Sequence, residues 1–206
     1  MPHSNVYIMD MNNVTWDWAL FEVLNFDGPA WLDNLMVAIS GVAMWIPLYL
    51  LIIYMVWRRY SWRGVVALLL AVGLAMGASD MIAGIFKHSG PLKHVWESFP
   101  VRLRPMFTEG LTDVSVVSTK HGLYGTVSAH AATIVSLALL SAVIVRRSWF
   151  TLLMTTVALL VCYSRIYLAC HFPQDILLGT LVGVVAGLAG VGLFRCIVRG
   201  DKCNNN

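Results

Sequence analysis

Five long runs of apolar residues, each bounded by polar or charged residues, constrain this chain more than any other feature. They cover about Leu35 to Trp57, Val65 to Phe86, Ser128 to Val145, Trp149 to Cys170 and Ile176 to Val198. A helix needs roughly 20 apolar residues to cross a bilayer. Backbone polar groups in lipid are satisfied only inside helices or closed barrels. The sequence therefore predicts an all-α, integral-membrane helical bundle with five transmembrane helices.

The composition favours the same setting. Of the 206 residues, 58% are hydrophobic and only 12% are charged, and the mean hydropathy is +0.72. Soluble domains carry about 25% charged residues. The net charge of +3 is small and no basic stripe is interleaved with aromatic residues, so no nucleic-acid partner is expected. The four cysteines are not spaced as a disulfide framework. We expect a single membrane domain over residues 1–206.

A shorter and more polar segment precedes the first apolar run. Val14 to Phe26 mixes bulky apolar residues with Asp17 and Glu22. Because it is too short and too polar to span a bilayer, an interfacial helix within an N-terminal segment of residues 1–30 is the better interpretation. The first dozen residues are polar and lack a basic region, so no cleavable signal peptide is expected.

The basic residues are distributed asymmetrically around the apolar runs. They cluster at Arg58 to Arg63, at Arg146 and Arg147, and at Arg195 to Lys202. With five spans these three clusters fall on one side, which the positive-inside bias predicts to be cytoplasmic. The N-terminus then lies outside, and residues 88–127 form an external loop.

Polar residues that are costly in lipid gather on the predicted outer side. The pattern Ser164-Arg165-x5-His171-x3-Asp175 lies between the last two runs. Pro173 is placed to open the last helix, with Asp175 in its first turn. A carboxylate that is hydrogen-bonded to one imidazole nitrogen, as Asp175 could be to His171, fixes the tautomer and leaves the other nitrogen as a nucleophile.

A second polar group leads into the third run. Ser128 is a natural N-cap, and the N–H groups of a helix N-terminus bind phosphate. His130 falls in the first turn, where it can donate a proton to a bound group. Arg104, followed by a proline, lies upstream in the predicted loop.

These three blocks, in this order, resemble the type 2 phosphatidic acid phosphatase (PAP2) superfamily of membrane lipid phosphatases. The block from Ser164 to Asp175 matches the family pattern in full. The middle block, usually Pro-Ser-Gly-His, is Val-Ser-Ala-His at residues 127–130. In the first block Arg104 and the next proline match, but Glu97 occupies the expected lysine position; Lys87 is our substitute and Lys93 the alternative.

The resemblance implies a metal-independent mechanism without any cofactor. His171 attacks phosphorus and forms a phosphohistidine, and Asp175 orients it. His130 protonates the leaving oxygen and then activates water. The phosphate-binding residues that the resemblance implies are Lys87, Arg104, Ser128, Ala129 and Arg165.

The implied protein is a multi-pass lipid phosphatase of the bacterial inner (cytoplasmic) membrane, with its site facing the periplasm or exterior. Its partners are the bilayer and a lipid phosphate: undecaprenyl diphosphate, phosphatidylglycerol phosphate or phosphatidate. Nothing in the sequence indicates an oligomeric state. Two alternatives stay open, namely vanadate-dependent haloperoxidase-like chemistry and a non-catalytic membrane transporter or scaffold with a degenerate phosphate site.

Three other features have two interpretations each. Asp80 either belongs to the site or forms an ion pair with Lys87 or Arg165. Arg102 is either a solvated loop cation or a ligand of the substrate headgroup. The glycines between residues 179 and 192 favour close helix packing over a catalytic role.

Overall fold

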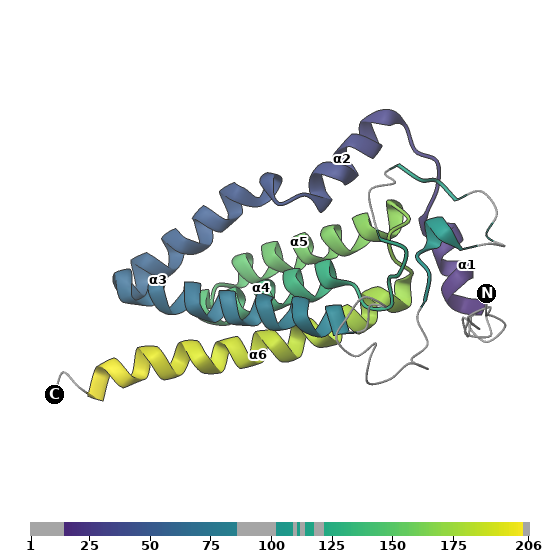
Figure 1. The fold of residues 1–206 in the computed structure, drawn as a ribbon. Coiled ribbons are helices and arrows are strands. Elements are labelled where there is room, and N and C mark those ends of the chain that lie inside the picture. The colour runs from purple at the N-terminus through teal and green to yellow at the C-terminus, as the bar shows by residue number, and fades with distance from the viewer. Residues whose placement is uncertain (1–14, 86–101, 109–110, 112–113, 118–121, 204–206) are drawn as a thin grey trace.

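The computed structural model describes residues 15–85, 102–108, 111, 114–117 and 122–203, and its regular elements are helices (Figure 1). The α-helices are α1 (Thr15–Leu24), α2 (Ala30–Ser40), α3 (Ile46–Ile85), α4 (Ala129–Val145), α5 (Ser148–Tyr167) and α6 (Pro173–Cys203). Two 3-10 helices, η2 (Ala43–Trp45) and η4 (Pro105–Phe107), complete them. The predicted all-α class is confirmed.

Helix α3 consists of two arms that meet at Ser61. Ser61 has non-helical φ and ψ angles of 58° and −168°, and the chain reverses direction there (Figure 1). The first two apolar runs therefore lie antiparallel. The first run is not one continuous helix as predicted, because Gly41 adopts an extended conformation and ends α2. The Gly41 N–H donates to the carbonyl oxygens of Val37 and Ala38. The 3-10 helix η2 then leads into α3.

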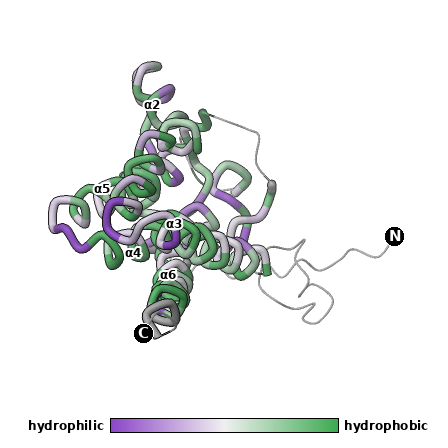
Figure 2. Tube along the Cα trace, turned by 90° about the vertical axis from the view of Figure 1, so that its left-hand side faces the viewer, coloured by the Kyte–Doolittle hydropathy of each residue, from purple (hydrophilic) through white to green (hydrophobic). Residues whose placement is uncertain are grey.

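Three helical stretches are long and apolar enough to cross a membrane: Ala43–Ile85, Ser148–Tyr167 and Pro173–Val198. Helix α4 is apolar but shorter. Hydrophobic residues cover much of the tube drawn in Figure 2. Large apolar side chains that are more than half exposed on α3, α5 and α6 include Leu69, Leu70, Leu74, Leu152, Leu159, Leu181, Val185 and Leu188. Such a surface is suited to lipid rather than to water.

Close packing of α6 on α4 aligns the start of one helix with the start of the other. A Cβ atom added at Gly179 would lie 2.4 Å from the Ser128 carbonyl oxygen, and one at Gly183 would lie 2.5 Å from that of Ala132. The Ser128 N–H also donates to the Asp175 carbonyl oxygen at 3.1 Å. The predicted packing face is confirmed for Gly179 and Gly183, whereas a carbon added at Gly192 would have no neighbour within 4 Å. The packing brings the second and third sequence blocks together.

Helix α1 lies within the segment predicted to form an N-terminal helix, and it docks on the connection between α5 and α6. Phe21 is buried and its ring lies 5.3 Å from that of Phe172. After the helix, the Asn25 side chain donates to the Tyr167 carbonyl oxygen at 2.7 Å. These contacts place α1 at the end of the bundle opposite the last turns of α6 (Figure 1).

Candidate active site

The connection between α5 and α6 folds tightly around the carbonyl group of Arg165. The N–H groups of Cys170 and His171 both donate to this oxygen, at 3.0 and 3.2 Å. Ala169 has a left-handed φ of 52°, which turns the chain away from α5. Pro173 begins α6 as predicted. As a result His171, at 2% exposure, is held inside the protein between two helix ends.

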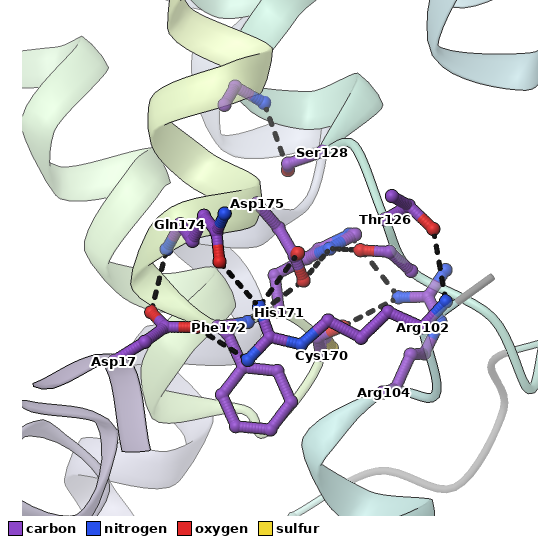
Figure 3. Close-up of polar contacts among 12 residues, drawn as sticks. Asp17, Arg102, Arg104, Thr126, Ser128, Cys170, His171, Phe172, Gln174 and Asp175 are labelled. Atoms are coloured by element: carbon purple, nitrogen blue, oxygen red, sulfur yellow. Dashed lines mark hydrogen bonds and ion pairs between the residues drawn. The ribbon is translucent and has the colours of Figure 1, made fainter. Parts of the chain in front are cut away.

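The hydrogen bonds of His171 define which of its ring nitrogens can react (Figure 3). Its Nδ1 lies 3.0 Å from the Gly125 carbonyl oxygen and 3.4 Å from Oδ2 of Asp175. Because a carbonyl oxygen only accepts, Nδ1 carries the proton in this arrangement. The lone pair is then on Nε2, which lies 3.3 Å from Nη1 of Arg104. Nε2 is therefore the unprotonated ring nitrogen, the one that could act as a nucleophile.

The surroundings of His171 favour its neutral form. Burial holds the pKa of His171 well below its ordinary value of 6.5, and the positive charges of Arg104 and Arg165 lower the pKa further. The hydrogen bond to the Gly125 carbonyl oxygen raises the pKa of His171, but this effect is smaller than that of burial. The imidazole is therefore uncharged at neutral pH, the form that a nucleophilic role would require.

Asp175 is supported from both sides. Its Oδ2 accepts from the Phe172 N–H at 3.1 Å, and its Oδ1 lies 3.6 Å from Nη1 of Arg102. Arg102 in turn contacts Asp17 of α1 at 2.5 Å, and its guanidinium lies 3.8 Å above the Phe172 ring. Arg102 is thus a largely buried support of Asp175 and not a solvated loop cation. It does not line the cavity beside His171.

Two arginines face that cavity, which has a volume of about 310 Å³. Arg104 and Arg165 are 8% and 4% exposed, and each has a buried Nε with no hydrogen-bond partner in the described part of the chain. Arg165 also donates through Nη1 to the Ser40 hydroxyl at the end of α2. Buried donors without a protein partner indicate a site for an external acceptor, and paired guanidinium groups suit an oxyanion such as phosphate.

A short backbone pairing brings the first block to the second. The Arg104 N–H donates to the Leu123 carbonyl oxygen at 2.9 Å, and the Gly125 N–H donates to that of Arg102 at 3.0 Å. A Cβ atom at Gly125 would lie 2.9 Å from Cγ of Arg104 and 3.3 Å from Nδ1 of His171. The site therefore needs glycine at position 125, which the sequence analysis did not single out for this purpose.

The start of α4 forms another wall of the cavity. Ser128 caps α4 as predicted, because its hydroxyl accepts from the Ala131 N–H at 3.3 Å. Ala129 and His130 line the cavity, whereas Ser128 is fully buried behind them. Ser128 thus shapes the helix end without lining the cavity itself.

The remaining wall is largely apolar. It includes Ile39, Val42, Trp45, Tyr49, Met76, Ile134, Leu137 and Val161. Asp80 also lines the cavity and forms no ion pair with Arg165, so that proposed pairing is wrong. Lys87, Lys93 and Glu97 lie outside the described residues. Within the described ranges, no group of three or more His, Cys, Asp and Glu side chains is arranged to hold a metal ion.

Sequence reasoning missed the residues that support the site from a distance. Asp17, Ser40 and Gln174 are the clearest examples: the Gln174 N–H donates to Oδ1 of Asp17 at 2.8 Å. The sequence did contain one signal for Asp17, namely an acidic residue within a largely apolar segment. A carboxylate that becomes buried requires a polar or charged partner. No pattern in the sequence identified that partner as Arg102.

Comparisons with known proteins found a matching family model, related sequences and solved structures of the same fold. Residues 64–197 match the family model of the PAP2 superfamily. The chain is 28% identical to a lipid A 4'-phosphatase of Bacteroides thetaiotaomicron over 171 residues, covering 80% of this chain and 72% of that protein. It is also 28% identical to an undecaprenyl-diphosphatase of Sulfolobus acidocaldarius over 177 residues, covering 83% and 75%.

Two solved structures share the fold at 21% sequence identity. LpxE of Aquifex aeolicus superposes with a TM-score of 0.58, covering 88% of this chain and 98% of that one. A transmembrane PAP2-type phosphatidylglycerolphosphate phosphatase of Bacillus subtilis superposes with a TM-score of 0.57, covering 97% and 88%.

Proposed function

The chain belongs to the PAP2 superfamily, and from this premise we propose that it is a multi-pass membrane phosphatase acting on a lipid phosphate monoester or diphosphate. One observation carries the proposal: Nε2 of His171 and the buried, unpartnered Nε groups of Arg104 and Arg165 belong to residues around one cavity. The adjoining apolar wall suits an amphiphile whose phosphate enters while its hydrocarbon stays in the bilayer.

In the first half of the reaction, Nε2 of His171 attacks phosphorus. The P–N bond forms as the bond to the lipid oxygen breaks, and His130 donates a proton to that oxygen. Asp175 and the Gly125 carbonyl group hold the Nδ1–H and stabilise the positive charge that develops on the ring. The reaction thereby produces a phosphohistidine and a lipid alcohol or lipid monophosphate.

The equatorial oxygens of the transferring group carry most of the charge to be stabilised. Arg104 and Arg165 supply two cations, Lys87 is proposed as the third, and the N–H groups at the start of α4, including that of Ala129, supply dipoles. In the second half, His130 accepts a proton from water as the water attacks phosphorus. Inorganic phosphate leaves and His171 is restored. We propose that no metal or other cofactor takes part.

We further propose that the two arms of α3 with α4, α5 and α6 form five spans within a single domain over residues 1–206. The N-terminus would lie outside, and the site would face the periplasm or exterior of a bacterial inner membrane. The arginines of the turns at 58–63 and 146–147 support this orientation, because they lie at the end of the bundle away from α1 (Figure 1).

Phosphate release by the purified protein in detergent tests the function directly. The panel contains phosphatidate, phosphatidylglycerol phosphate, undecaprenyl diphosphate and lipid A, each assayed with and without chelator. We expect release from at least one lipid, unaffected by chelator, with a His171→Ala variant as the blank. Release that requires an added metal would contradict the proposed chemistry, and no release from any of the four lipids would contradict the function.

A further inference from the structure

A second cavity, of about 720 Å³, lies at the end of the bundle opposite the active site. Its walls come from the first arm of α3 and from the connection between α4 and α5. The lining residues are Tyr54, Met55, Arg58, Arg59, Val145, Arg146 and Arg147. Four arginines from two distant parts of the chain therefore line one open cavity.

Backbone contacts fix two of these arginines, Arg59 and Arg146. Nη1 of Arg59 donates to the Val145 carbonyl oxygen at 2.9 Å, which ties α3 to the end of α4. Arg146 has a left-handed φ of 55°, and its N–H closes α4 on the Ala142 carbonyl oxygen at 2.9 Å. The cavity is therefore part of the helix packing and is not formed by side chains on a loose loop.

The charge of this cavity is not balanced by nearby protein groups. No carboxylate lies within ion-pairing distance of the four arginines where the structure describes side chains, and the ion pairs recorded there are all near Asp175. All four arginines are exposed. Like charges around one cavity repel one another, so a bound anion lowers their free energy.

Aromatic residues indicate the depth of the cavity in the membrane. Trp57, Trp62 and Trp149 flank the same two turns and are each more than half exposed. Exposed tryptophans mark the headgroup level of a bilayer. Phosphate groups of phospholipids lie at that level, next to the four arginines.

We propose that this cavity binds the phosphate of an anionic phospholipid headgroup, from the leaflet opposite the active site. Basic pockets between transmembrane helices recognise such headgroups. The ligand is a phosphodiester that is bound and not hydrolysed, because His171 and His130 lie at the other end of the bundle. The bound lipid would hold the α3 turn against the α4–α5 connection.

The test compares two double variants by native mass spectrometry in detergent with equal amounts of phosphatidylglycerol and phosphatidylcholine. Arg58→Gln with Arg147→Gln removes two charges from the cavity. Arg63→Gln with Arg195→Gln removes two charges from the same end without altering its lining. Arg59 is left intact because it caps α4. We assign about 1 kcal/mol, or about fivefold in affinity, to each arginine that contacts the bound headgroup, and much less to Arg63 and Arg195, which lie outside the cavity.

We expect the parent protein and the Arg63/Arg195 control to retain phosphatidylglycerol in preference to phosphatidylcholine. The Arg58/Arg147 variant should bind phosphatidylglycerol about 25-fold more weakly, at the same fivefold per arginine. Phosphate release from the substrate lipid should be unchanged in both, which shows that the fold is intact. Equal losses in both double variants, or equal retention of the two lipids, would overturn the proposal.

A competition arm separates a lipid headgroup from free phosphate, since both present the same oxygens. Inorganic phosphate and glycerol 1-phosphate are added at millimolar concentration to the complex with phosphatidylglycerol. We expect the lipid to remain bound, because its chains contribute to affinity. If inorganic phosphate displaces the lipid from the parent protein and from the Arg63/Arg195 control, but not from the Arg58/Arg147 variant, the ligand is free phosphate. That result would overturn the headgroup assignment.

Discussion

Asp17 of α1 and Arg102 of the following loop form an ion pair at 2.5 Å, and Asp17 is fully buried. The same guanidinium reaches Asp175 at 3.6 Å, so Asp17 is connected through one side chain to the carboxylate beside His171. An N-terminal helix outside the three family blocks thus helps to position the proposed catalytic histidine.

We predict that Asp17→Asn lowers both stability and turnover. A hydrogen bond to a charged group contributes about 1.5–3 kcal/mol, and a displaced Arg102 would change the position of Asp175. The expected effects are a lower unfolding midpoint and a kcat reduced severalfold with KM little changed. Glu22→Gln on the same helix is the control, because Glu22 is exposed. Equal effects of the two changes would argue against a role through Arg102.

His171→Ala should abolish turnover. The substitution removes the nucleophile from a connection whose backbone bonds to Arg165 remain available, so the protein should stay folded. Acid-labile phosphate should be trapped on the parent protein and not on the variant. Normal turnover by a folded His171→Ala protein would rule out the mechanism.

His130→Ala should slow both halves of the reaction, since one residue supplies the proton and later accepts one. A substrate whose leaving group has a low pKa does not need that proton. With such a substrate the His130→Ala variant should form the phosphoenzyme at a normal rate. Hydrolysis of the phosphoenzyme should stay slow, so that the phosphoenzyme accumulates. Measurement of both steps by rapid quench tests this asymmetry, and its absence would indicate that His130 only binds phosphate.

The pH dependence should report the charge near His171. Protonation of Nε2 removes the nucleophile, so activity is lost as the pH falls through the pKa of His171, which lies well below 6.5. Arg104 contributes to that low pKa. Arg104→Gln should therefore raise the pKa and move the acidic limb of kcat/KM to higher pH, besides lowering its plateau. An acidic limb that does not move would show that another group controls it.

Gly183→Ala should disrupt the packing of α6 on α4. Its added methyl group would lie 2.5 Å from the Ala132 carbonyl oxygen, and overpacking of this kind costs about 1–3 kcal/mol. Gly192→Ala on the same helix is the matched control, because nothing lies within 4 Å of its added carbon. We expect a lower unfolding midpoint for the first variant only. Equal unfolding midpoints for the two variants would mean that α4 and α6 can move apart without loss of stability.

Local sequence determined much of what the structure contains. The helical class follows from apolar runs that must satisfy their own backbone in lipid. Ser128 as an N-cap, Pro173 at the start of α6 and the glycine face of α6 depend on near neighbours or on a simple repeat, and each is confirmed. The break at Gly41 was missed, because one glycine in an apolar run is also compatible with a continuous helix.

Only the tertiary structure decided how residues far apart in the sequence meet. The Gly125 carbonyl oxygen accepts a hydrogen bond from His171, 46 positions later in the sequence. Arg102 contacts both Asp17 and Asp175, which lie 85 positions before it and 73 positions after it. Such pairs leave no periodic signal, because their geometry depends on the packing of several helices at once. The sequence by itself determined which groups carry the proposed chemistry, whereas long-range packing decided which nitrogen of His171 carries the proton and which residues hold the ring.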